Sequence, residues 1–158
     1  MPPLIDHRAM ARAIEIPPPR PMRPEDEPVV RELYATLHPT WPERAAGWYT
    51  AYPTLTIWVG GRLVGFTSCS ISPGQGTLVL YGNDLGVRPE WRRQGVGWAL
   101  AEARVALGRA VGAKFFIGIT QPSNVSMCRI FERQGFHSCQ PMPGYFHGED
   151  GIVWAGSL

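Results

Sequence analysis

The sequence predicts an α/β (α+β) domain with a mixed sheet, and three observations support this fold class. A Gly-Gly pair between the β-rich runs Leu55–Val59 and Arg62–Ile71 suits the positive φ angles of a tight hairpin. A β-type run that ends at Val87 and a buried run over 114–120 are separated by a long helical pattern, which predicts a parallel crossover. The length of 158 residues fits one domain with one core.

Apolar spacing predicts the helices. The first covers 23–37, where acidic residues fill the first turn, and a shorter one lies within 42–52. A third follows Pro89 and ends with Gly112 as its C-cap. Its apolar face comprises Val96, Leu100, Ala103, Leu107 and Val111, while Glu102, Arg104 and Arg109 fall elsewhere. The fourth opens at the cap-type residues Ser123 and Asn124 and stops at Gly135.

The two ends of the chain are less regular. Residues 1–13 precede the proline-rich "IPPPRP" and are expected to form a loosely attached extension to a domain over 14–158. At the other end, β-type runs at Phe136–Cys139 and Ile152–Ala155 flank a loop rich in Gly, Pro and aromatic residues. Within it, Glu149 and Asp150 are expected to form a turn.

Composition excludes several classes of function. A net charge of +2, with arginines spread along the chain, argues against nucleic-acid binding. The first residues carry charges and no continuous apolar run, so neither a signal peptide nor a membrane span is expected. The 3 cysteines have no CxxC spacing, which predicts reduced thiols in a cytoplasmic protein and no zinc cluster.

The stretch "RPEWRRQGVGWAL" (88–100) places three arginines and two glycines at a helix start, where exposed N–H groups attract anions. Gly95 and Gly97 let backbone N–H groups approach an anion, and Arg88, Arg92 and Arg93 supply mobile countercharge. A P-loop is excluded because no Gly-Lys-Ser/Thr ends the loop, and a dinucleotide fingerprint lacks its third glycine.

With this loop the chain resembles the GNAT superfamily of acyl-CoA-dependent N-acyltransferases. The pattern is "RRQGVG" at 92–97, and the resemblance extends from about Ile14 to the C-terminus through the hairpin, Asn124 and "IFERQGF". It implies a mostly antiparallel sheet of about six to seven strands with one central parallel pair, flanked by about four helices. It also implies acetyl-CoA as co-substrate and no metal.

The resemblance further implies where the cofactor binds. In the family, main-chain N–H groups of the loop hold the pyrophosphate, and the preceding strand splays from its parallel neighbour to bind the pantetheine arm. Asn124 matches an asparagine that contacts the pantetheine, and it equally suits a helix N-cap. The implied cofactor-binding residues are Leu85, Gly86, Val87, Arg92, Arg93, Gln94, Gly95, Val96, Gly97, Trp98, Asn124 and Phe131.

Acyl transfer to an amine needs a proton acceptor, donors for the oxyanion and, optionally, an acid for the departing thiolate. The resemblance assigns the oxyanion donors to backbone N–H groups near Leu85 to Val87. The family often places a tyrosine as the acid where this chain has Phe131, so Tyr145, Cys128 or water are the substitutes. Phe131 is also expected to touch Phe136 across a Schellman helix ending.

The residues proposed as the catalytic base, and those proposed to bind the amine substrate, each have two interpretations. Asp84 is either the base or a carboxylate of a turn or bulge, and His38 is either a base or a surface histidine. His38, Trp41 and Asp84 are expected to bind the substrate. The nearby aromatic residues Trp48, Tyr49 and Tyr52 either join this wall or pack in the core.

The expected function is therefore an acetyl-CoA-dependent N-acetyltransferase, in which a primary amine attacks directly within a ternary complex. The alternative is an acyl-CoA sensor or partner-binding module with weak or no catalysis, which Phe131 motivates. The sequence leaves open the acceptor, the acyl preference and whether the chain forms a homodimer.

Overall fold

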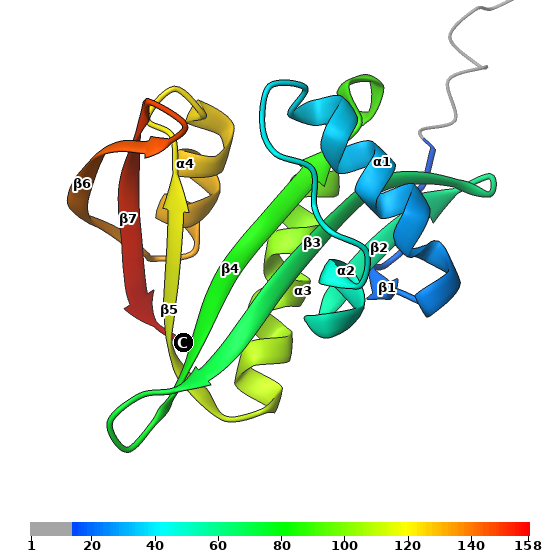
Figure 1. Ribbon diagram of the computed structural model, residues 1–158. Helices are drawn as coiled ribbons and strands as arrows, with labels where there is room; N and C mark the ends of the chain where they lie inside the picture. The colour runs from blue at the N-terminus through cyan, green and yellow to red at the C-terminus, as the bar shows by residue number, and fades with distance from the viewer. Residues whose placement is uncertain (1–13) are drawn as a thin grey trace, which may run out of the picture.

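A seven-stranded sheet in the order β1-β2-β3-β4-β5-β7-β6 organises this computed structural model, which describes residues 14–158 (Figure 1). Its strands are β1 (Arg20–Pro21), β2 (Thr54–Val59), β3 (Arg62–Pro73), β4 (Leu78–Val87), β5 (Ala113–Thr120), β6 (His137–Phe146) and β7 (Glu149–Ser157). Within the described chain, β4 and β5 pair in parallel and the other neighbouring strands pair antiparallel. The predicted mixed sheet is thus confirmed, whereas the expected extension over 1–13 lies outside the described residues.

The helices cover both faces of the sheet. They are α1 (Glu27–Leu37), α2 (Trp48–Ala51), α3 (Val96–Ala110) and α4 (Val125–Arg133), with short 3₁₀ helices at Pro24–Asp26 and Pro89–Trp91. Helices α1 and α2 lie on one face and α3 crosses the other, as Figure 1 shows. The predicted hairpin is confirmed, since Gly60 and Gly61 have φ angles of 57° and 76°.

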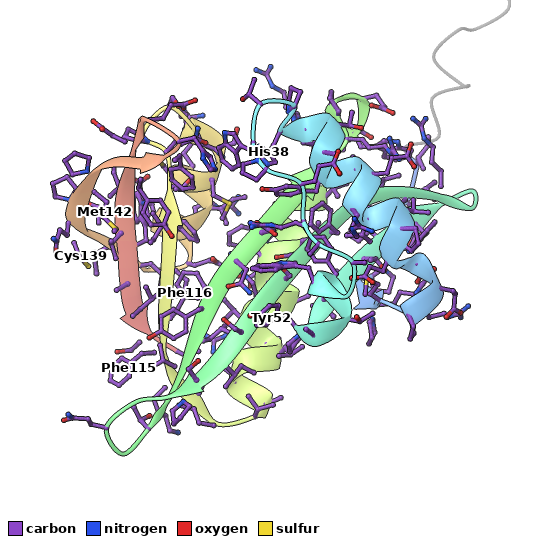
Figure 2. The ribbon with its side chains drawn as sticks, in the orientation of Figure 1. His38, Tyr52, Phe115, Phe116, Cys139 and Met142 are labelled. Carbon is purple, nitrogen blue, oxygen red and sulfur yellow. The ribbon has the colours of Figure 1, made fainter. Side chains whose placement is uncertain are left out.

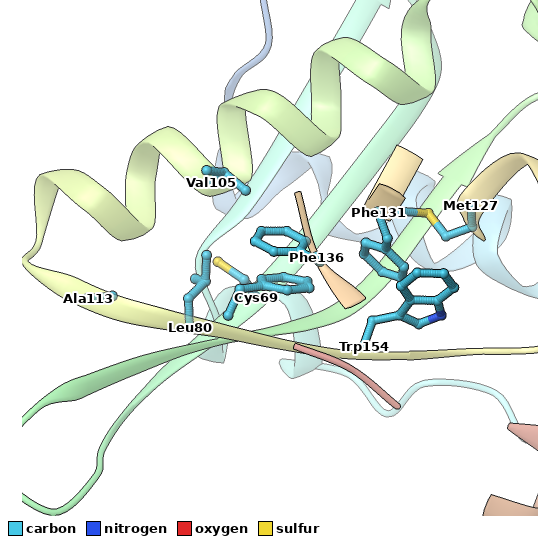
Figure 3. Close-up of a cluster of buried hydrophobic side chains, with 9 residues drawn as sticks. Cys69, Leu80, Val105, Ala113, Met127, Phe131, Phe136 and Trp154 are labelled. Atoms are coloured by element: carbon cyan, nitrogen blue, oxygen red, sulfur yellow. The ribbon is translucent and has the colours of Figure 1, made fainter. Parts of the chain in front are cut away.

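A hydrophobic cluster joins α3 and α4 to the centre of the sheet (Figure 3). The Phe116 ring on β5 stacks on Phe136 with centroids 4.4 Å apart and lies 5.4 Å from Phe131 on α4. On the opposite face, a second cluster packs α1 and α2 against β3. Phe115 was expected in a buried strand but is 46% exposed (Figure 2). Successive residues of a strand face opposite sides of the sheet, and on the side opposite Phe116 helix α1 packs over β3 and β4 and leaves β5 uncovered.

The buried face of α3 differs from the predicted face. Val111, expected inside, is 48% exposed, while Arg104, expected outside, is 3% exposed. The physical reason is close approach to the sheet: at Gly108, an added Cβ would lie 2.6 Å from the Leu80 side chain. Small residues such as Ala101 and Gly108 therefore face the strands. The prediction placed only the apolar residues of the helix on its buried face and so identified this face incorrectly.

The C-terminal hairpin is longer than predicted. Strands β6 and β7 continue to a two-residue turn at His147 and Gly148, which have φ angles of 51° and 98°. The expected turn at Glu149 and Asp150 is wrong, because both residues begin β7. Prolines in β6 are tolerated since β6 is the edge of the sheet and one of its sides needs no partner strand.

Candidate functional site

The central parallel strands part at a pair of glycines. Pairing between β4 and β5 ends at Gly82 and Gly118, yet β4 runs on to Val87 and β5 to Thr120, and the two strands diverge in Figure 1. Opposite, the register between β3 and β4 shifts between Thr67 and Cys69, which leaves two residues of β4 facing one residue of β3. Such a bulge bends a strand and increases its twist. The splayed strand predicted before the glycine loop is therefore present.

A cavity of about 580 Å³ lies at this divergence. Its walls come from the end of α1 and the segment after it, from β4, β5 and α4, and from the β6–β7 turn. The cavity brings together these residues proposed from the sequence: His38, Trp41, Asp84, Leu85, Asn124, Phe131 and Tyr145. It also contains two arginines, Arg44 and Arg104, that were not proposed as site residues.

The glycine loop contains two residues with left-handed backbone conformation. Gly95 is the N-cap of α3 with a φ of 86°, and Arg93 before it also has a positive φ of 59°. An added Cβ at Gly97 would come no closer than 3.7 Å to any neighbour, and one of these neighbours is the cavity residue Leu85. The loop therefore begins α3 beside the end of β4.

The arginine side chains of the loop differ in the hydrogen bonds that hold them. Arg88 donates from Nε to the carbonyl of Leu63, so it is held in place and the prediction of a mobile side chain is wrong for it. Arg92 donates to the Val87 carbonyl at 3.3 Å. Neither Arg92 nor Arg93 pairs with a carboxylate within residues 14–158. Their positive charges remain available beside the helix start, where an anion is favoured.

Asp84 is the centre of a polar network in the cavity wall. Its two carboxylate oxygens accept from Arg44 Nη2 at 2.8 Å and Nε at 3.1 Å, and Oδ2 also accepts from the Tyr49 hydroxyl at 2.9 Å. The Arg44 guanidinium lies over the rings of Tyr34 and Trp48 at 4.7 and 4.5 Å. Burial, and secondarily the charge of Asp84, raise the pKa of Tyr49 well above its ordinary value, so its hydroxyl stays a donor.

An aromatic stack crosses the other side of the cavity. His38 stacks on Trp41 with centroids 4.2 Å apart, and Trp41 stacks on Phe146 at 5.4 Å. In Figure 2, His38 lies at the end of α1 nearest the β6–β7 hairpin. Burial lowers the pKa of His38 below its ordinary value of 6.5, so the imidazole is neutral at pH 7. His38 is thus a half-buried cavity residue that can accept a proton.

Helix α4 presents two of the proposed residues to the cavity. Asn124 caps the helix, since its side chain accepts from the Met127 backbone N–H at 3.2 Å, and it also lines the cavity, so both interpretations remain compatible. The predicted Schellman ending is confirmed: the Phe136 N–H donates to the Phe131 carbonyl at 3.0 Å, and Gly135 has a φ of 82°.

The proposed substitutes for an acidic tyrosine separate in space. Tyr145 lines the cavity and is 48% exposed. Cys128 contributes nothing to the described cavity wall, and its Sγ lies 3.9 Å from the Gln121 carbonyl. All three cysteines are free in the described chain. Residues 14–158 also contain no group of three His, Cys, Asp or Glu side chains placed to bind a metal. No helix in this range has the length and apolarity to span a membrane.

The fold and the site define an α/β domain of the acyltransferase type, with a glycine loop beside a splayed parallel strand pair. Residues 18–136 match the family described as "Acetyltransferase (GNAT) family", and the chain belongs to this family. Comparison with curated proteins gives no match.

Solved structures share the fold. NAA60 of Arabidopsis thaliana, crystallised with a bisubstrate analogue, is 16% identical with a TM-score of 0.77, covering 90% of this chain and 98% of that one. YncA, described as a putative acetyltransferase from Salmonella typhimurium with acetyl-CoA, is 20% identical with a TM-score of 0.75, covering 91% and 94%. A ribosomal-protein-alanine N-acetyltransferase from Brucella melitensis is 16% identical with a TM-score of 0.72, covering 89% and 99%.

Proposed function

We propose that this chain transfers an acetyl group from acetyl-CoA to a primary amine, by direct attack of the amine within a ternary complex. The observation that carries the proposal is the cavity at the parting of β4 and β5. Leu85 lines one side of it and lies 4.0 Å from a Cβ built at Gly97, so the start of α3 adjoins the cavity through this residue, and the other side is an aromatic and polar wall. Two substrates can thus approach one point from different sides.

The residues around the loop fit coenzyme A. Backbone N–H groups from Arg93 to Trp98 would hold the pyrophosphate, with Arg92 and Arg93 supplying positive charge. The edge of β4 beyond Gly82 is no longer paired with β5, so its backbone can bond the pantetheine amides as a neighbouring strand would. When bound, acetyl-CoA supplies the activated acyl group.

We assign the proton transfers to cavity residues. His38, neutral at pH 7, accepts the proton from the incoming ammonium directly or through water. Asp84, the acidic candidate from the sequence, holds Arg44 and Tyr49 through its two oxygens. Asp84 is therefore a positioning residue in this proposal. Tyr145 or water protonates the thiolate, which with a pKa of about 8.5 is already a tolerable leaving group.

The acceptor is a small amine or the amine of a peptide. The wall that faces it combines the flat rings of His38 and Trp41 with the guanidinium of Arg44. Aromatic faces hold apolar groups or an ammonium. Because the guanidinium is already paired with Asp84, an amine that also carries an apolar group, as many amino acids and short peptides do, suits this wall best.

The test is acceptor-dependent release of coenzyme A. The protein is mixed with acetyl-CoA and a thiol reagent, and amines, amino acids and short peptides are added in turn. We expect at least one acceptor to raise thiol release above that of acetyl-CoA alone, and mass spectrometry to show the acetylated amine. If no acceptor does so, the proposal of an enzyme fails.

A second function is an acyl-CoA-binding module without efficient catalysis. It is favoured by Phe131, which is 3% exposed and presents no hydroxyl where the family often has tyrosine. This function predicts a thermal shift without turnover. Coenzyme A at one hundred times its Kd should then stabilise the protein by about 2.7 kcal/mol.

A further inference from the structure

Arg104 is a buried cation with no carboxylate within ion-pair distance in residues 14–158. The side chain reaches inward from α3, is 3% exposed, and makes one hydrogen bond, from Nη1 to Thr67 Oγ1 at 3.2 Å. Its Nε and Nη2 groups are buried and find no acceptor within residues 14–158, where no carboxylate pairs with the guanidinium. Buried charges in proteins are normally paired, because loss of hydration is costly.

The guanidinium lies at the point where β4 and β5 part, in the wall of the cavity. A Cβ added to Gly82 would be 2.9 Å from Arg104 Cζ, so the missing side chain at this position makes room for the guanidinium. The Phe116 ring lies on another side, with its centroid 5.4 Å from Cζ. Thr67 is itself anchored, since its hydroxyl donates to the Asp84 carbonyl at 2.9 Å. These contacts hold the guanidinium in one place.

The surroundings suit an incoming anion. Burial lowers the pKa of Arg104 to about 10, so the side chain still carries its charge at pH 7. A methionine could fill the same apolar space between α3 and Phe116 without the cost of burying a charge. Since Nε and Nη2 have no acceptor within residues 14–158, a ligand carboxylate that reaches the guanidinium from the cavity would supply both hydrogen bonds and a negative charge.

We propose that Arg104 recognises a carboxylate at the free end of the acyl group, so that this chain accepts CoA thioesters of dicarboxylic acids, such as malonyl-CoA and succinyl-CoA. The inference rests on the proposed function, because it requires an acyl-CoA in the cavity. The acyl carbon chain would extend from near Leu85, where the backbone donors for the thioester are proposed, toward Gly82, whose missing side chain makes room for the guanidinium. The two positions lie on the same strand, three residues apart.

The experiment compares matched acyl-CoA pairs by calorimetric titration, without acceptor. Malonyl-CoA is compared with propionyl-CoA, and succinyl-CoA with butyryl-CoA, so that each pair differs in the terminal carboxylate. In at least one pair, the carboxylate should improve the affinity of the unaltered protein about tenfold or more. Arg104→Met should remove this preference while the affinity for free coenzyme A stays within about threefold. Arg109→Met, on the exposed side of the same helix, is the matched control and should keep the preference.

Thermal unfolding without ligand provides a second readout. If Arg104 is retained for a ligand, Arg104→Met should melt at or above the temperature of the unaltered protein, because an unpaired buried charge is removed. A large drop in melting temperature would indicate a structural role and overturn the proposal. Arg104→Gln, which replaces the charge by a shorter neutral amide, serves if the methionine variant does not fold.

The remaining outcomes separate this inference from the proposed function. Equal affinities within both pairs for the unaltered protein overturn the inference, as does a preference that survives in Arg104→Met. If Arg104→Met weakens free coenzyme A and all thioesters alike, the arginine binds the cofactor itself and the inference is wrong, whereas the proposed function stands. If free coenzyme A does not bind the unaltered protein, the proposed function fails and the inference falls with it.

Discussion

Gly95→Asp tests the anion site because the chain contains a matched control at the other end of the same helix. Gly95 before α3 and Gly112 after it both have a φ of 86°, and an added Cβ at either would meet no atom within 4 Å. Asp at either position therefore carries the same strain, about 1 kcal/mol for a left-handed conformation, and no clash. Only the Gly95 variant places its carboxylate where a pyrophosphate is proposed to bind.

The expected effect on affinity follows from the two charges. A carboxylate about 5 Å from a phosphate charge is repelled by about 3 kcal/mol at an effective dielectric constant of about 20. This corresponds to about a hundredfold weaker binding of coenzyme A. The helix itself tolerates the change, because the charge of Asp suits the positive end of the helix dipole. At Gly112 the same charge faces the negative end and costs about 0.3–1 kcal/mol of stability.

The assay measures coenzyme A affinity by calorimetry and stability by thermal unfolding for the unaltered protein and both variants. We expect Gly95→Asp to fold and to bind coenzyme A weakly, and Gly112→Asp to be less stable but to bind normally. Unaltered affinity in Gly95→Asp would refute the reasoning, because the loop would then be only structural. Equal weakening in both variants would show a general effect of strain on α3 and would refute it as well.

Three further predictions concern the cavity. Burial holds the pKa of His38 below its ordinary value of 6.5, so the unfolded chain binds more protons than the folded chain does. The free energy of unfolding should therefore fall as the pH drops below 6.5. His38→Gln should flatten this pH dependence, measured by urea titrations at several pH values. Phe131→Tyr should keep or raise turnover, because Phe131 lines the cavity. The control Phe136→Tyr lies in the same cluster but outside the cavity wall, and it should lower the free energy of unfolding by about 1–3 kcal/mol without raising turnover. A large loss of turnover in Phe131→Tyr would contradict the assignment. Asp84→Asn removes the negative charge that pairs with Arg44, whose side chain is 29% exposed. This change should lower the free energy of unfolding by about 1–3 kcal/mol, and an unchanged free energy would count against the network.

Features that depend on a few neighbouring residues were predictable. The Gly60-Gly61 turn, the glycine that follows α3 and the Schellman ending at Gly135 follow from backbone conformations that glycine adopts easily. The glycine loop at 92–97 belongs to the same class, since its N–H groups and charges are all local. The parallel crossover was predictable because a helix of this length between two β-type runs returns the chain in the same direction.

Features that depend on distant residues required the tertiary structure. Asp84 and Arg44 are 40 positions apart, and nothing in either local sequence indicates that they pair. The aromatic stack across the cavity likewise joins Trp41 to Phe146 from opposite ends of the chain. The hairpin of β6 and β7 was shortened in the prediction because prolines weaken the strand pattern, and their tolerance depends on β6 being an edge strand.

The sequence by itself determined the family, the strand order around the crossover and the position of the glycine loop, because each rests on local backbone preference or on a short contiguous motif. The tertiary structure alone decided which face of α3 is buried, since close approach at Gly108 turns that face and carries Arg104 inward with it. It likewise decided that Arg44 pairs with Asp84 in the wall of the cavity. Packing between elements sets these positions, and no local pattern records them.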